Sequence, residues 1–546
     1  MSVRFLRSGV VVIAGLVSLV PAGVGASGTP TNVRVTQDNT AGGYARYDGA
    51  SDATMLDCSI NKRAQNEPTV AVDLRNPDIL TAGANDYCAA PVNGDVWAGY
   101  YRSTDKGRTW RDSLVPGYPD DSSAGGLASP AHGSCGAAGD PTQSFDRQGR
   151  VFYGFICFNR AKPVNGSTFV ATYDQDGGHY LRTALVDPGT PSAQFVGSGL
   201  FQDKINLAVD QTSGPNSGNV YVAWARYSGK APNNVILFSR STDHGASFSQ
   251  PIRVTPGLGE ETFADLAVGP DGTVWLTYRN FAHQSSTSNT ISVERSTDGG
   301  QSFSEPQILA EITPFESTQF SGNGSDSCGD APFACPTGLT FKRFSSFSAV
   351  TADAGGAHVV WNAELGSGQA KIFVRNSADG IKWSPATTLD TVARGHQYWP
   401  DIASANGVIT VVFMDSRNDA AYAPNLPPGN TAGGTNSGGA EDAFVAQSSD
   451  GGKTWTETRV SNFSSNLNWE THGSRKVPFW GDYIYVSAVP GAVNVTWTDS
   501  RDLVPGVDQR DPTATDGFDI LQCNASTLAS CNSQGGLDQN IYSARL

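Results

Sequence analysis

One eight-residue pattern recurs along the chain, and it limits the possible folds more than any other feature. The pattern is Ser-x-Asp-x-Gly followed three positions later by Trp or Phe, and its clearest copy is Ser103, Asp105, Gly107 and Trp110. Within such a turn the Asp accepts hydrogen bonds from backbone amides, and the Gly allows a positive φ. Other copies begin at Ser241, Ser296 and Ser448, with a shortened copy at 377–383 and a degraded one at 174–178. This repetition predicts one repeat-built domain, although 546 residues would otherwise suggest several.

A second repeat accompanies the first and allows the structural units to be counted. It is a pair of short strands with alternating apolar and polar residues. The first strands of the pairs are expected at 67–73, 140–146, 203–210, 265–268, 347–350, 401–403 and 482–486. The second strands are expected at 79–82, 151–155, 220–224, 274–278, 358–361, 408–413 and 493–497. Seven pairs predict seven units.

The Ser-x-Asp-x-Gly pattern resembles the Asp box, or BNR repeat, of the sialidase superfamily. The resemblance implies an all-β propeller in which each box lies between the third and fourth strands of a blade, away from the binding face. With seven strand pairs, we expect a seven-bladed β-propeller of four-stranded blades. The six-bladed sialidase type is the alternative.

The last unit lacks a box, and the N-terminal segment is expected to complete it. Residues 32–36 read Asn-Val-Arg-Val-Thr and match the segments that follow two boxes, at 252–255 and 458–461. The third strand of this unit is expected at 518–521 or at 539–545. We therefore expect the N-terminal strand to close the ring, which would remove exposed sheet edges at the seam.

The N-terminus has the features of an export signal. Arg4 and Arg7 precede an apolar stretch that begins at Val10, and small residues lead to Ala26. We expect residues 1–26 to be a signal peptide and 27–546 to be a single propeller domain. No later segment approaches the length of a membrane span, which predicts a secreted, extracellular or periplasmic protein without stable membrane insertion.

Cysteine content and charge narrow the environment and the partners. Eight cysteines without a CxxC pair or a Cys/His cluster predict disulfides in an exported chain. The simplest local pairing is Cys58–Cys88, Cys135–Cys157, Cys328–Cys335 and Cys523–Cys531. The formal net charge of −15 argues against nucleic acid as a partner. We expect a glycan or polysaccharide partner and a monomeric chain.

Acidic residues recur near the start of the predicted innermost strands, at the face opposite the boxes. They are Glu67, Asp140, Asp203, Asp265, Asp401 and Asp482. Clustered carboxylates raise one another's pKa, so Asp140, Asp203, Asp401 and Asp482 are the candidate catalytic residues. The ring could instead hold Ca²⁺ or serve only to cap turns and pair with arginines. No sequence motif for a metal or another cofactor is present.

Arginines and tryptophans near the same face are candidates for substrate binding. Arg forks bind carboxylates at two points, which an acidic sugar would require. Aromatic rings suit stacking on sugars, although they could equally be wedges between blades. The candidates are Arg279, Arg343, Arg417, Arg501, Trp399 and Trp480. Asp415-Ser-Arg417 and Asp499-Ser-Arg501 are duplicates, which favours ion pairs that hold loops at these two places.

The resemblance implies hydrolysis of terminal sialic acids by three arginines, a Tyr activated by Glu, and an Asp acid/base. This sequence departs from that set. Asn66-Glu67-Pro68 stands where the family usually has Arg-Ile-Pro, and no Tyr/Glu pair can be assigned. We therefore expect a secreted glycan-active enzyme, such as a sialidase-like exo-glycosidase. The alternatives are a polysaccharide lyase and a non-catalytic glycan- or protein-binding propeller.

Overall fold

The computed structural model describes most of the chain. The described residues are 29–159, 165–191, 199–228, 234–255, 259–282, 288–315, 346–424, 428–429, 438–466, 480–503 and 538–546. The predicted signal peptide, Arg343 and four of the eight cysteines lie outside them. Among the described residues, no helix is long and apolar enough to cross a membrane.

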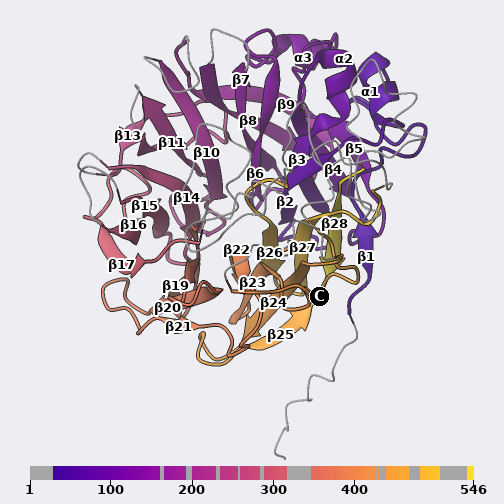
Figure 1. The fold of residues 1–546 in the computed structure, drawn as a ribbon. Coiled ribbons are helices and arrows are strands. Elements are labelled where there is room, and N and C mark those ends of the chain that lie inside the picture. The colour runs from indigo at the N-terminus through magenta and orange to yellow at the C-terminus, as the bar shows by residue number, and fades with distance from the viewer. Residues whose placement is uncertain are drawn as a thin grey trace, which may run out of the picture.

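The chain folds into sheets of four antiparallel strands that surround a common centre, as in a β-propeller (Figure 1). Each such group of four strands is called a set. In each of the first three sets the chain runs from the innermost strand to the outermost. The first set is β2 (Gln65–Val72), β3 (Leu80–Asp86), β4 (Trp97–Ser103) and β5 (Arg111–Leu114). The second is β6 (Ala137–Phe145), β7 (Val151–Asn159), β8 (Asn165–Asp174) and β9 (His179–Asp187). The third is β10 (Leu200–Val209), β11 (Val220–Ser228), β12 (Asn234–Ser241) and β13 (Ile252–Arg253).

Three more sets follow in the same order. They begin with β14 (Glu261–Val268), β15 (Val274–Asn280), β16 (Asn289–Ser296) and β17 (Gln307–Ile312). Next come β18 (Ser348–Asp353), β19 (Gly356–Glu364), β20 (Ala370–Ser377) and β21 (Thr387–Thr388). The third of them is β22 (Gln397–Ala405), β23 (Val408–Asp415), β24 (Asp442–Ser448) and β25 (Thr456–Arg459). The second and third sets of the chain are joined into one eight-stranded sheet by a single parallel pair, Phe201 with Gly166.

The remaining set combines the two ends of the chain. It contains β26 (Tyr485–Val489), β27 (Ala492–Asp499), β28 (Asn540–Arg545) and, as its outer strand, β1 (Asn32–Arg34). Asn32 pairs with Ala544 and Arg34 with Tyr542, in antiparallel register. The N-terminal segment thus takes the predicted place beside the last set. The third strand lies at the second of its two predicted positions.

The repeated Ser-x-Asp-x-Gly turns share one hydrogen-bond pattern. After β4, the Gly107 amide donates to Ser103 Oγ at 2.9 Å, and the Thr109 amide donates to Asp105 Oδ1 at 2.9 Å. The copies that begin at Ser241, Ser296 and Ser448 repeat both bonds. Every one of these turns joins the third strand of a set to the fourth, so its role is to shape the outer hairpin.

Buried aromatic and aliphatic side chains fill the spaces between neighbouring sets. Trp224, Trp361 and Trp497 lie on second strands and are at most 2% exposed. Among the described residues, four short helices lie outside the sheets: α1 (Ala53–Cys58), η1 (Tyr87–Ala89), α2 (Ala90–Asn93) and α3 (Ala124–Ala128). Two predicted disulfides, Cys58–Cys88 and Cys135–Cys157, are confirmed. The pairs Cys328–Cys335 and Cys523–Cys531 lie outside the described residues.

Candidate active site

A β-bulge interrupts five of the innermost strands near their first residues. In each of the five, the pairing register with the second strand shifts, as between Asn66 and Thr69 in β2. Each bulge contains a residue with a φ between +51° and +54°, and these residues are Glu67, Asp140, Lys204, Phe263 and Trp399. Positive φ is uncommon outside glycine, and strained backbone concentrates at functional sites. The five bulges lie near the first residues of strands that pack around the common centre, so this end of the innermost strands is the candidate site.

The predicted acidic ring is not a single layer of equivalent residues. Glu67 and Asp140 have the positive φ themselves, whereas Asp203 directly precedes such a residue, Lys204. Asp265 and Asp401 lie two positions beyond Phe263 and Trp399. These carboxyl groups occupy different positions relative to the bulges, because each bulge adds a residue and changes which side chains point inward.

Four of the carboxyl groups gather around one ammonium group. Lys204 Nζ forms an ion pair with Asp482 Oδ2 and lies 3.7 Å from Asp140 Oδ2. Glu67 and Asp203 also interact electrostatically with this ammonium. The Lys204 and Asp140 side chains are each 12% exposed and that of Asp482 is 2% exposed, so the cluster is largely shielded from water.

Asn85 holds Glu67 by a hydrogen bond, and Gly481 leaves the space that the Glu67 side chain occupies. Asn85 Nδ2 donates to Glu67 Oε2 at 2.7 Å, and Asn85 Oδ1 accepts from the Asp140 amide at 2.8 Å. Gly481 has a φ of +85°, and a Cβ there would lie 2.2 Å from Glu67 Cγ. A glycine is therefore needed for Glu67 to approach this closely.

The cluster contains carboxyl groups of different proton affinity. Burial, reinforced by Asp140, raises the pKa of Asp203 to about 7, even though Lys204 opposes the shift. Burial and the charge of Asp140 also raise the pKa of Glu67 well above its usual range. Burial alone would lower the pKa of Lys204, but the surrounding carboxylates raise it well above its usual value, so the ammonium stays charged. A protonated carboxyl group and an ionised carboxylate can therefore coexist in this cluster near pH 7.

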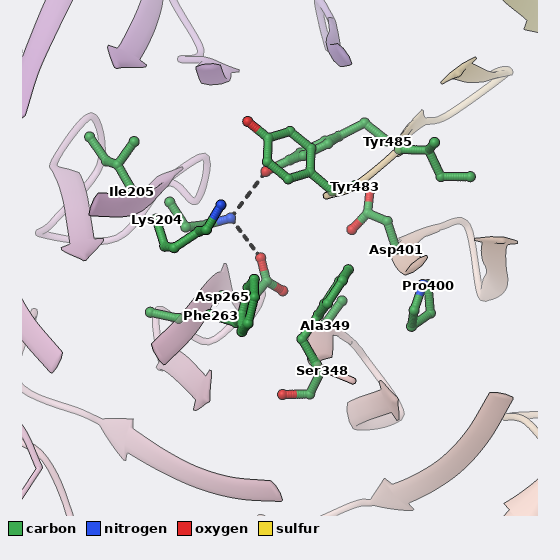
Figure 2. A pocket seen from close by; sticks show the side chains of 14 residues that line it. Lys204, Ile205, Phe263, Asp265, Ser348, Ala349, Pro400, Asp401, Tyr483 and Tyr485 are labelled. Carbon is green, nitrogen blue, oxygen red and sulfur yellow. Dashed lines mark hydrogen bonds between the residues drawn. The ribbon is translucent and has the colours of Figure 1, made fainter. Parts of the chain in front are cut away.

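A small cavity of about 60 Å³ adjoins the cluster at Lys204 (Figure 2). Phe263 and Phe347 form an aromatic wall, with ring centroids 5.2 Å apart, and Lys204 Nζ lies 5.6 Å from the Phe263 centroid. Tyr483 and Tyr485 line the cavity as well. Asn206, Asp265, Asp401 and Tyr485 also border a larger cavity of about 230 Å³ along the innermost strands.

Asp265 and Asp401 fasten neighbouring sets to each other. Asp265 accepts from the Val350 amide at 2.7 Å and from Asn206 Nδ2 at 2.7 Å. Asp401 accepts from the Val486 amide at 2.7 Å. Burial raises the pKa of Asp265 to about 7 and that of Asp401 well above its usual range. The hydrogen bond of Asp401 joins β22 to β26, and a catalytic role of Asp401 stays a prediction.

The candidate arginines that the structure describes are engaged elsewhere. Arg279 is fully buried and donates to the Ser346 carbonyl at 3.0 Å and to Asn289 Oδ1 at 2.8 Å. Arg417 pairs with Asp415 and Glu457, both through contacts of 2.6–2.7 Å. Arg501 pairs with Asp499 at 2.7 Å, as Arg417 does with Asp415. Arg343 lies outside the described residues, so substrate binding by these arginines stays a prediction.

The two candidate tryptophans are buried rather than presented at a surface. Trp399 is 1% exposed and Trp480 is 3% exposed, and both belong to one hydrophobic cluster with Tyr398 and Trp497. The aromatic side chains that line the cavity are instead Phe263, Phe347, Tyr483 and Tyr485.

Sequence reasoning missed Lys204, Phe263 and Phe347. One signal could have identified the first two, because both stand two residues before a polar residue of an innermost strand. Lys204 precedes Asn206 and Phe263 precedes Asp265 at the same spacing by which Trp399 precedes Asp401. Among the described residues, no group of three His, Cys, Asp or Glu side chains could hold a metal ion.

No protein-family model and no curated protein matches this chain. Several solved structures are similar. An α-L-arabinanase of Penicillium chrysogenum is 13% identical, with a TM-score of 0.43, over 73% of this chain and 97% of its own. An α-L-arabinofuranosidase of Fusarium graminearum is 13% identical, with a TM-score of 0.43, over 76% and 97% of the two chains. A Hadza microbial sialidase is 12% identical, with a TM-score of 0.40, over 77% and 71%. Likeness this remote carries no argument about activity.

Proposed function

We propose that this protein is a secreted glycan-active hydrolase, an exo-glycosidase on a sialidase-like propeller, with its active site at the Lys204 cluster. The observation that carries the proposal is the set of four buried carboxyl groups around one ammonium, beside a cavity with an aromatic wall. Glycoside hydrolysis needs one protonated carboxyl group and one ionised carboxylate on either side of the scissile bond. Burial among like charges is the usual way to obtain that difference.

In this mechanism Asp203 is the general acid and Asp482 the ionised partner. A pKa of about 7 leaves Asp203 partly protonated at neutral pH, so it can give its proton to the glycosidic oxygen. The ammonium of Lys204 stabilises the carboxylate of Asp482. That carboxylate either attacks the anomeric carbon, and water activated by Asp203 then hydrolyses the glycosyl ester, or it removes a proton from a water that attacks directly. In both cases the sugar departs as its hemiacetal.

We further infer that seven four-stranded sets form a closed ring, with β1 as the outer strand of the last. The inference is supported by the innermost strands, which pack against one another in chain order: β2, β6, β10, β14, β18, β22, β26 and again β2. Deleting residues 27–36 should then lower the melting temperature by several degrees, because β28 loses its outer partner and becomes an exposed sheet edge. Deleting 27–31 is the control, since it removes no residue of β1.

The second candidate is a non-catalytic glycan-binding propeller. The deep burial of Glu67 and Asp482, each 1% exposed, favours it, because both groups already have partners within the protein.

Product analysis separates the two candidates. The purified mature protein is incubated with sialosides and with neutral and acidic polysaccharides, with and without Ca²⁺. Released monosaccharide supports the exo-glycosidase, unsaturated uronate indicates a lyase, and no product indicates a binding module. Asp203→Asn and Asp482→Asn should each lower kcat at least about 100-fold, whereas Glu305→Gln, an exposed carboxylate beside a distant turn, should not. If both active-site variants kept full activity, the site assignment would be wrong.

A further inference from the structure

We infer that the cavity beside Lys204 accepts the uncharged end of a neutral glycan and rejects sugars that bear a carboxylate. This inference rests on the proposed function and names the substrate class of the same site. Three features of the described residues support it: the excess of acidic over cationic side chains in the cluster, the engagement of the described candidate arginines, and the lining of the cavity.

The cluster contains more acidic than cationic side chains. The ammonium of Lys204 is paired with Asp482, and the Asp140 carboxylate lies 3.7 Å from it. Glu67 and Asp203 interact with the same ammonium, so four acidic side chains share one cation. A ligand carboxylate placed here would be repelled, and a neutral sugar would not.

The candidate arginines that the structure describes are committed to other groups. Arg279 donates to the Ser346 carbonyl and to Asn289, Arg417 to Asp415 and Glu457, and Arg501 to Asp499. Freeing any of these guanidinium groups for a ligand would leave a buried polar partner without its bond, which is costly.

The cavity itself offers surfaces for an uncharged sugar. Its aromatic wall of Phe263 and Phe347 suits the C–H face of a sugar ring. Among the described residues that line the cavity, Lys204 is the only cation, and it is already paired with Asp482. A ligand carboxylate would therefore have to compete with Asp482 for that ammonium, whereas a neutral sugar would not.

The experiment compares substrates that differ only in a carboxylate. Arylglucoside is paired with arylglucuronide and arylgalactoside with arylgalacturonide, and neutral oligosaccharides are paired with their uronic-acid counterparts. Cleavage is followed by product release and binding by titration calorimetry, at pH 7 with the mature protein. We expect the neutral member of a pair to have a kcat/KM at least about tenfold higher. Asp140→Asn, which removes one negative charge, should narrow that ratio about threefold, and Glu305→Gln should leave it unchanged.

Each outcome supports or overturns the inference. Faster cleavage of the neutral members supports it. Equal or faster cleavage of the acidic members overturns it while the hydrolase proposal stands, and loss of that cleavage in Arg343→Ala would name the missing anchor. Binding of neutral oligosaccharides without any cleavage supports the substrate class but overturns the hydrolase. If neither class is bound or cleaved, both proposals fail.

Discussion

Replacing Lys204 by methionine would remove the only positive charge among the described residues of the acidic cluster while keeping a side chain of similar length. At an effective dielectric constant of about 20, the separation of 3.7 Å from Asp140 corresponds to about 4 kcal/mol. Breaking one partner of a buried ion pair typically costs about 3–5 kcal/mol, because the remaining charges stay buried. We therefore expect Lys204→Met to lower the free energy of unfolding by about 3 kcal/mol at pH 8.

The pH dependence of this loss is the stringent part of the prediction. Lys204 lowers the pKa values of Glu67 and Asp203, so these values rise without the ammonium, and protonation at low pH relieves the repulsion in the cluster. The difference between wild type and variant should fall below about 1 kcal/mol at pH 4. Urea denaturation at both pH values measures it, and the double variant Lys204→Met/Asp482→Asn should recover part of the loss. A loss below about 1 kcal/mol at pH 8, or an equal loss at both pH values, would refute the reasoning.

Three further predictions concern other parts of the fold. Burial raises the pKa of Glu294 from 4.5 to about 8, so ionisation of this group destabilises the fold as pH rises through this window. Glu294→Gln should remove about 5 kcal/mol of this pH-dependent loss of unfolding free energy, as measured by urea titrations at several pH values. Gly481→Ala should lower the free energy of unfolding by more than about 2 kcal/mol. The control Gly407→Ala should lower it by only about 1 kcal/mol, because Gly407 has a φ of +73° but no atom within 4 Å of an added Cβ. Equal melting temperatures of the two variants would contradict the crowding argument. Replacing Cys58 and Cys88 by serine removes a disulfide that closes a loop of 30 residues, so the unfolded chain gains conformational entropy. The free energy of unfolding should fall by about 3–4 kcal/mol, which urea denaturation measures as a lower midpoint than that of the oxidised wild type.

The strands and turns could be predicted from the sequence because their signals are local. Short runs rich in apolar and aromatic residues mark β10 and β11, and the pattern at Ser103 marks the turn after β4. Each of these signals reflects only a few neighbouring residues. The match between 32–36 and the other outer strands placed β1 beside the last set. The disulfide Cys58–Cys88 followed from proximity in the chain.

The site could be predicted only in part. Asp140, Asp203 and Asp482 do meet at one end of the channel, as their position near the starts of the innermost strands indicated. Lys204 went unnoticed because it follows Asp203 directly, and in a regular strand neighbouring side chains point to opposite faces. The bulge between Asp203 and Asn206 breaks that alternation.

The amino-acid sequence by itself thus determined the repeated turns, the order of the strands and the segment that pairs with the C-terminal strand. Only the tertiary structure decided which side chains reach the channel, since a shift of one residue in pairing moves a side chain to the other face of a sheet. It also decided that Arg279 and Trp399 are buried, because contacts between neighbouring sets, rather than the chemistry of a side chain, determine whether it is exposed.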